Sequence, residues 1–197
     1  MVGSPVPDSK TLLRHALVAT LLSILPGLSL ASNVNVGEPP PDNIGASTDG
    51  ERIRVSDDTG KLQIVSFWAT WCAPCRKELP VLNAIQKQVG ADRMRVIAVN
   101  LEEPRAQFRR AMRAYKDFEI TFVHDKKGIT ARRYGVKGIP FLVIIDVDGT
   151  VAYTHTGYGE ATLPKIVDEI NELLIRNQLA GANPLQEQPG DAQAAGH

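Results

Sequence analysis

The chain has 197 residues, of which 43% are hydrophobic and 22% charged, values typical of a soluble globular protein. Its 22 basic and 22 acidic residues give a net charge of zero, which argues against binding to nucleic acid through global charge. The only cysteines are Cys72 and Cys75. Two cysteines are too few for a disulfide-stapled small scaffold or a four-cysteine metal site, so we expect the two thiols to act as a pair.

The N-terminal segment has the pattern of a secretory signal peptide. Lys10 and Arg14 precede an apolar run over residues 16–25, a Pro-Gly pair follows, and a small residue stands at Ala31. We expect cleavage after Ala31, which removes residues 1–31 and places the mature protein in the periplasm or another extracytoplasmic space. The alternative is an uncleaved membrane anchor, although the apolar segment is short for the roughly 20 residues that span a bilayer.

The C-terminal end, residues 179–197, has no hydrophobic periodicity and almost no large apolar side chain. Such a composition cannot offset the entropy that is lost on ordering, so we expect a disordered tail. The folded domain is then expected over residues 37–178. Its first residues, 38–43, are rich in proline and predict an extended lead-in.

Strand-like and helix-like patterns alternate between these ends. Short apolar runs predict strands, and apolar residues at spacings of three and four predict amphipathic helices. An Asp148-Gly149 pair between two strand-like runs is a hairpin signal. The predicted elements are, in order, strand 61–67, a helix that follows Cys75 and ends at Gly90, strand 95–100, helix 104–116, strand 121–123, helix 127–134, strands 141–147 and 150–156, and helix 163–175. This order predicts an α/β fold with a mixed central sheet and helices on both faces.

The two cysteines lie where the first long strand ends and the first helix begins, in the sequence Trp71-Cys72-Ala73-Pro74-Cys75. A thiol at a helix N-terminus faces unpaired N–H groups and the positive end of the helix dipole, so its thiolate form is favoured. We therefore expect Cys72 to be the exposed nucleophile and Cys75 the shielded thiol that resolves a mixed disulfide. Pro74 suits the first turn of a helix, where its missing N–H is not needed.

Two other interpretations of the cysteine pair are an inert pair in the core and a zinc or copper site. A zinc site would need His124 and His155 as its remaining ligands, because the other two histidines lie in the leader and the tail. The strand–CxxC–helix context favours redox chemistry over both interpretations. We therefore expect neither a resident metal nor a cofactor.

Two motifs, FWATWCAPCRKELP at residues 67–80 and GVKGIPFLVIIDVDGTV at residues 135–151, resemble the TlpA/ResA branch of thioredoxin-like proteins. Members of this branch are exported or membrane-tethered thiol–disulfide oxidoreductases. The resemblance spans about 140 residues and implies a thioredoxin-like fold. Residues 104–123 look like the branch's central helix-and-strand insert.

The resemblance also implies roles for individual residues. Ile139-Pro140 matches the family's cis-proline, which lies against the two sulfurs and offers backbone to a substrate strand. Glu78 matches a glutamate that the branch carries three residues after the second cysteine. Because this position shares a helix face with Cys75, its carboxylate is expected either to disfavour the thiolate charge or to relay a proton. A solvated helix carboxylate is the simpler alternative for Glu78. Ser66 stands where thioredoxins keep a buried aspartate, and Glu78 is a candidate to replace that proton acceptor.

Around this centre we expect a surface that binds the substrate, formed by Trp71, Pro74 and Ile139. Catalysis itself is expected to need Cys72 and Cys75, together with the glutamate and the cis-proline described above. Trp68 is expected either to shape the same surface or to belong to the core.

Residues 105–137 form a basic segment with ten basic and three acidic side chains, a net charge of +7. Four of the basic residues lie within about 80° of one another on the predicted helix: Arg105, Arg109, Arg113 and Lys116. The simpler interpretation is a solvated face that covers an apolar stripe. The alternative is a docking surface for an acidic partner or an anionic lipid.

Together these observations predict an exported disulfide reductase. Its expected clients are proteins with disulfides, such as apocytochromes c or copper-site proteins, and its expected electron donor is a membrane thiol–disulfide transporter. One alternative is an oxidase that introduces disulfides, because an Ala-Pro pair between the cysteines does not determine the reduction potential. Another is a copper-binding metallochaperone that uses Cys72, Cys75 and His124.

Overall fold

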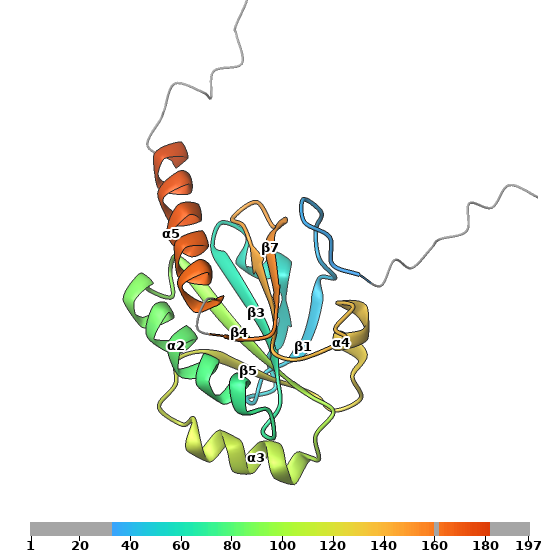
Figure 1. Ribbon diagram of the computed structural model, residues 1–197. Coiled ribbons are helices and arrows are strands. Elements are labelled where there is room, and N and C mark those ends of the chain that lie inside the picture. Colours follow the sequence, from blue (N-terminus) through green and yellow to red (C-terminus); the bar gives the residue numbers. More distant parts are fainter. Residues whose placement is uncertain (1–32, 160–161, 182–197) are drawn as a thin grey trace, which may run out of the picture. The chain divides into compact units, whose positions relative to one another are not determined.

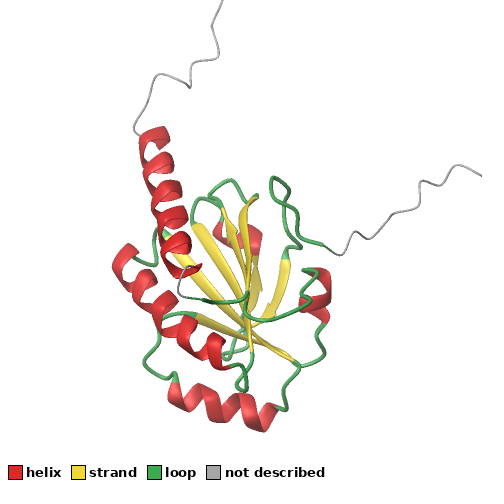
Figure 2. Ribbon diagram, viewed as in Figure 1, coloured by secondary structure: helices red, strands yellow, loops and turns green. Residues whose placement is uncertain are grey.

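The structure is a computed structural model that describes residues 33–159 and 162–181. A five-stranded sheet forms its centre (Figures 1 and 2). The strands are β3 (Leu62–Trp68), β4 (Met94–Leu101), β5 (Thr121–Asp125), β6 (Phe141–Ile145) and β7 (Val151–Thr156). They lie in the order β5-β4-β3-β6-β7, so the strand that leads to the cysteines is the central one.

The sheet is mixed, as the sequence predicts. β3, β4 and β5 run parallel to one another, whereas β6 pairs antiparallel with both β3 and β7. Parallel strands need a crossover, and the helices between β3, β4 and β5 provide it. The two strands of the β6–β7 hairpin meet at a turn in which Gly149 adopts a φ of 85°, a conformation that glycine accepts without strain.

Four α-helices accompany the sheet in the described ranges, with the central pair of helix and strand, α3 and β5, forming the predicted insert. They are α2 (Ala73–Val89), α3 (Arg105–Ala114), α4 (Ile129–Arg133) and α5 (Thr162–Gly181). α5 continues three residues into the segment that the sequence assigns to the tail. A tertiary contact explains the difference, because Arg176 and Asn177 near this end both bond to the carboxylate of Asp146 in the β6–β7 turn.

Alternation along β3 divides the core into two clusters. Leu62, Ile64 and Trp68 face α2, α3 and α5, whereas Val65 and Phe67 face the opposite side of the sheet. All seven residues of β3 are buried because both faces are covered. The fold therefore has helices on both faces, as predicted, with α2 and α5 on one side and α4 on the other.

Part of the second face is covered by a small hairpin that the sequence did not predict. β1 (Asn43–Ala46) pairs antiparallel with β2 (Arg52–Arg54), and a 3-10 helix, η1 (Val55–Asp58), follows. Ile44 and Ile53 are its buried anchors. The remaining residues are polar or small, so these short strands carry only a weak apolar pattern in the sequence.

The proposed signal peptide, residues 1–31, lies outside the described residues, as does the tail from residue 182 onward. The cleavage after Ala31 and the disorder of the tail therefore stay predictions. Within residues 33–159 and 162–181, no helix combines the length and the hydropathy that crossing a membrane requires.

Candidate active site

The cysteine pair lies at the start of α2, a few residues after the carboxyl end of β3. Cys72 is the N-cap residue of the helix, and its sulfur accepts a hydrogen bond from the backbone N–H of Cys75 over 3.3 Å. The two cysteines form a disulfide with a Cα–Cα distance of 5.3 Å. Pro74 lies in the first helical turn, where an N–H has no partner within the helix. The local placement that the sequence predicts is therefore present.

Exposure differs along the motif. Trp71 is 67% exposed, Cys72 is 4% exposed and Cys75 is fully buried. Cys72 is thus the more accessible of the two cysteines, but it is buried, whereas the sequence predicts an exposed residue. The reason is packing, because both cysteines belong to the apolar cluster between the sheet and the helices. Trp68 also belongs to this cluster and is fully buried, which assigns it to the core.

The Ile139–Pro140 peptide bond is cis, as the resemblance implies. β6 begins at the next residue, and its first residue pairs with Phe67 of β3. This register places Pro140 beside the carboxyl end of β3, from which the chain continues to Cys72. Ile139 is half-buried and packs against the cluster that contains both cysteines. The position suits the proposed contact with a substrate strand.

Ser66 and Glu78 form a buried polar pair on the face of the sheet that α2 and α5 cover. Ser66 lies on the same side of β3 as Trp68, and Glu78 lies one turn after Cys75 on α2. The Ser66 hydroxyl donates a hydrogen bond of 2.7 Å to the Glu78 carboxylate. Glu78 is only 1% exposed, so the solvated position considered as an alternative is wrong.

Burial changes the acid–base behaviour of Glu78. Removal from water penalises the charged carboxylate and raises the pKa of Glu78 from 4.5 to about 7, although the hydrogen bond from Ser66 opposes the shift. A carboxyl group with this pKa exchanges a proton readily near neutral pH. Glu78 therefore has the property that a proton relay beside Cys75 requires.

A second buried carboxylate, Glu103, was missed by the sequence analysis. It accepts hydrogen bonds from the backbone N–H of Thr70 at 2.9 Å and from the Thr70 hydroxyl. The side-chain amide of Asn100 donates a third bond at 2.6 Å. Thr70 lies two residues before Cys72, in the segment 69–72 between β3 and α2, which we call the cysteine loop. The hydrogen bonds of Glu103 therefore connect the cysteine loop to the segment between β4 and α3. Thr70 and Glu103 are 33 residues apart, so no local pattern reveals their contact.

The two histidines considered as zinc ligands have other partners. A ring nitrogen of His124 lies 2.8 Å from the backbone oxygen of Glu103, and the ring stacks on Phe108 with 4.5 Å between centroids. A ring nitrogen of His155 lies 2.5 Å from the carboxylate of Glu169. In the part of the chain that the structure describes, no three His, Cys, Asp or Glu side chains are grouped as metal ligands.

A disulfide at the N-terminus of a helix, beside a central strand and a cis-proline, defines a class of protein. The sheet order, the crossover helices and the C-terminal hairpin are those of the thioredoxin-like fold. Fold and site together are those of a thiol–disulfide oxidoreductase.

Comparisons with known proteins agree with this class. The AhpC/TSA family matches residues 36–154. Thioredoxin-like protein YneN of Bacillus subtilis is 36% identical over 127 residues, which cover 63% of this chain and 73% of YneN. Thiol-disulfide oxidoreductase ResA of Geobacillus thermodenitrificans is 29% identical over 159 residues, which cover 76% of this chain and 89% of ResA.

A solved structure from Chlorobium tepidum, described as a thiol:disulfide interchange protein DsbE, superposes with a TM-score of 0.64 at 35% identity. The superposition covers 72% of this chain and 99% of the Chlorobium chain. The chain therefore belongs to the AhpC/TSA family, and its relatives place it among the ResA-like thiol–disulfide oxidoreductases.

Proposed function

We propose that this protein is an exported reductase of disulfides in client proteins, such as apocytochromes c or copper-site proteins. The observation that carries the proposal is the Cys72–Cys75 disulfide at the N-terminus of α2, with Glu78 buried one turn later. The helix N-terminus favours the thiolate of the N-terminal cysteine, and the buried carboxyl group can take a proton from the other cysteine.

The first half of the reaction joins enzyme and client. The reduced enzyme presents the thiolate of Cys72, which attacks one sulfur of the client disulfide. A bond forms between Cys72 and that sulfur, the client S–S bond breaks, and the second client sulfur leaves as a thiolate that takes up a proton. The product is a mixed disulfide. The backbone beside Pro140 and the exposed ring of Trp71 are the groups that we expect to position the client segment.

The second half releases the client. Glu78, as a carboxylate, accepts the proton of the Cys75 thiol, and the resulting thiolate attacks Cys72. The Cys72–Cys75 bond forms, the mixed disulfide breaks, and the remaining client sulfur leaves and is protonated. In the complete reaction the client gains two electrons and two protons, and the enzyme ends as the disulfide seen in the structure.

The chain holds no third cysteine, so reduction of its disulfide needs an external donor. A membrane thiol–disulfide transporter is the donor that we propose. The signal-like pattern at residues 1–31 supports export to an extracytoplasmic space. The same segment would tether the protein to the membrane if it is not cleaved.

The experiment that tests the direction is a measurement of the reduction potential of the Cys72–Cys75 pair, poised against dithiothreitol or glutathione and read by tryptophan fluorescence. We expect a potential near or below about −250 mV, in the range of thioredoxin, which suits a reductase. A value near about −120 mV, as in a strong oxidant, would replace the proposal with an oxidase that introduces disulfides.

A Cys75→Ser variant is the control for this measurement, because it cannot form the internal disulfide. With dithiothreitol as the reference couple, which resolves mixed disulfides by cyclising, it should show no reversible two-electron step, so any fluorescence change that it retains does not report the redox pair. If the natural chain also showed no such step, the metal-binding alternative would be favoured.

A further inference from the structure

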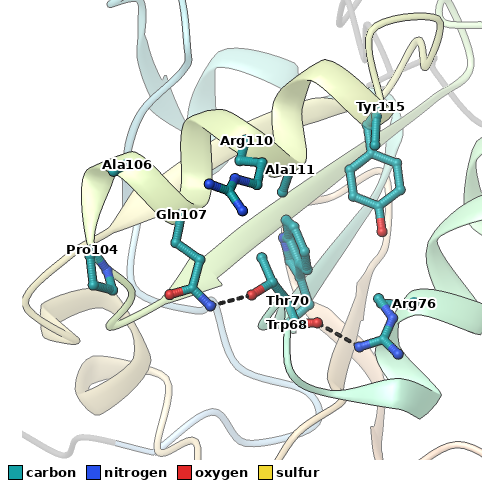
Figure 3. A pocket seen from close by; sticks show the side chains of 10 residues that line it. Trp68, Thr70, Arg76, Pro104, Ala106, Gln107, Arg110, Ala111 and Tyr115 are labelled. Atoms are coloured by element: carbon teal, nitrogen blue, oxygen red, sulfur yellow. Dashed lines mark hydrogen bonds between the residues drawn. The ribbon is translucent and has the colours of Figure 1, made fainter.

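A groove of about 650 Å³ lies beside the cysteine loop, on the side of α3 (Figure 3). The start of α2 and the residues before it form one wall, and α3 forms the other. The lining residues that matter here are Trp68, Thr70, Arg76, Arg110, Ala111 and Tyr115. We call this feature the α3 groove.

The sequence of α3 explains why the groove exists. Phe108 is buried, and through it one face of the helix packs against the core. The face turned toward the cysteine loop bears Ala106, Ala111 and Ala114, whose small side chains leave space between the two walls. The exposed arginines Arg109 and Arg113 lie outside the groove. The helix therefore has three faces, namely a core face, a groove face and a solvated basic face.

The groove combines an apolar lining with positive charge. Ala111 and Tyr115 supply apolar surface above the buried Trp68, and the guanidinium groups of Arg76 and Arg110 stand on opposite walls. No acidic side chain belongs to the described residues that line it. Charge complementarity then favours an occupant that presents a carboxylate together with an apolar side chain.

The two walls are held in place before any ligand binds. The side-chain amide of Gln107 donates to the Thr70 hydroxyl over 2.8 Å, and Arg76 donates to the backbone oxygen of Thr70 over 2.6 Å. Glu103 accepts two further bonds from Thr70. A groove that is already formed costs little ordering entropy when a ligand enters it.

We propose that the α3 groove binds a segment of the client polypeptide that carries an apolar side chain and a carboxylate close to the cysteine attacked by Cys72. The inference rests on the proposed reductase function. The position of the groove supports a client as the occupant, because Thr70 precedes Cys72 by two residues and Arg76 follows Cys75 directly. A chain joined to Cys72 by a mixed disulfide therefore lies beside the rim of the groove.

The test compares two synthetic peptides, each with an internal disulfide. They differ at two positions near one cysteine, and each of these positions is next to a Leu. One peptide has Glu at both positions and the other has Gln at both. Stopped-flow fluorescence gives the second-order rate constant for each peptide with the reduced, full-length protein. We expect the Glu peptide to react about tenfold faster at low salt, with a gap that narrows as ionic strength rises. Equal rate constants would overturn the proposal.

Charge reversal on α3 locates the effect. Arg110→Glu should abolish or invert the preference for the Glu peptide, whereas Arg113→Glu makes the same charge change on the solvated face and should retain it. A loss of preference in both variants would indicate general surface charge rather than the groove and would overturn the proposal.

Filling the groove provides a test without any change of charge. Ala114→Leu places a larger side chain in the groove and should slow reaction with the Glu peptide several-fold. Ala84→Leu makes the same substitution at an exposed position of α2 outside the groove and is the matched control. Equal rate constants for the two variants would contradict a site in the groove.

Two further measurements separate the groove from the reductase function. Versions of both peptides with serine in place of cysteine report binding to the oxidised protein by calorimetry, and the Glu version should bind more tightly. Hydroxyethyl disulfide, a neutral small molecule, reports the redox reaction alone. Tighter binding of the Glu version without reduction of hydroxyethyl disulfide would refute the reductase function and retain an acid-binding groove. Reduction of hydroxyethyl disulfide with equal binding of both versions would refute the groove alone.

Discussion

Two buried glutamates lie on either side of the cysteine motif, and their surroundings differ. Glu78 lies on the face of the sheet that α2 and α5 cover, and among the described residues it accepts one hydrogen bond, which comes from Ser66. Glu103, in the loop before α3, accepts three hydrogen bonds from Thr70 and Asn100. The same residue type at similar burial thus has one donor in one place and three in the other.

The different number of hydrogen-bond donors suits Glu78 to proton transfer and Glu103 to positioning. With one donor to offset the loss of hydration, burial raises the pKa of Glu78 to about 7, so this group can change its charge during turnover. Glu103 instead joins the cysteine loop to the segment between β4 and α3, and its three bonds restrain the backbone just before Cys72. We expect Glu78 to act in the chemistry and Glu103 to hold the loop.

The largest expected effect follows from removing the positioning carboxylate. Glu103→Ala leaves the N–H and hydroxyl of Thr70 and the amide of Asn100 without their acceptor in a buried site. Since hydrogen bonds to a charged group contribute about 1.5–3 kcal/mol each and are not additive, we expect a loss of about 3–5 kcal/mol in the free energy of unfolding. Urea denaturation followed by fluorescence measures it.

The control for this prediction is Glu119→Ala. Glu119 forms an ion pair with Lys87 at 3.6 Å, and both side chains are exposed, so its carboxylate should contribute less than about 1 kcal/mol. Similar losses in the two variants would mean that Glu103 does not hold the loop, and the distinction between the two buried glutamates would fail.

The next largest effect concerns the pH dependence of stability caused by Glu78. The carboxyl group titrates near 4.5 in the unfolded chain, whereas the pKa of Glu78 in the folded protein is about 7. Between these values the folded protein binds more protons than the unfolded chain, so stability falls as pH rises from about 4.5 to 7 and then levels. The expected loss is about 3 kcal/mol, and Glu78→Gln should remove it.

This loss is measured as the difference in the free energy of unfolding between the natural protein and Glu78→Gln, from pH 4 to pH 8 on the oxidised form. Contributions from other titrating groups cancel in the difference. Gln88→Ala, a neutral change at an exposed position of α2, should displace the stability curve without altering its shape. A difference between natural protein and Glu78→Gln that stays constant with pH would refute the raised pKa of Glu78.

Local patterns predict the sheet and its helices, because each of these elements contributes a periodic apolar face. The buried run of β3, the amphipathic α2 and the Asp148-Gly149 hairpin are examples. The β1–β2 hairpin depends on two apolar residues, Ile44 and Ile53, which are buried in a cluster that includes residues of β3 to β7. Such an element leaves only a weak apolar pattern in the sequence.

In the candidate site, too, some features could be predicted from the sequence and others could not. The cysteine pair and its helix N-terminus are contiguous in the sequence, so their geometry could be predicted. The family resemblance singled out Ser66 and Glu78 as related positions, but the hydrogen bond between their side chains was not predicted from the sequence. The contact between Thr70 and Glu103 joins segments 33 residues apart, and an exposed carboxylate has the same sequence signature as a buried one.

The smallest effect is expected at Ser66, which tunes the group that moves the proton. Its hydroxyl stabilises the charged form of Glu78, so Ser66→Ala should raise the pKa of Glu78 further, by about one pH unit or less for a bond that contributes about 1 kcal/mol. The ¹³C chemical shift of the Glu78 carboxyl group, followed through a pH titration of the oxidised protein, measures the midpoint. The assignment of this signal comes from its absence in Glu78→Gln.

Thr130→Val is the matched control for this last change, because it removes another buried hydroxyl, one that donates to the backbone oxygen of Ile44 over 2.9 Å on the opposite face of the sheet. This variant should lose stability without moving the Glu78 midpoint. An unchanged midpoint in Ser66→Ala would mean that the hydroxyl does not stabilise the carboxylate. Burial alone would then determine the pKa of Glu78, and the number of donors would no longer distinguish the two buried glutamates.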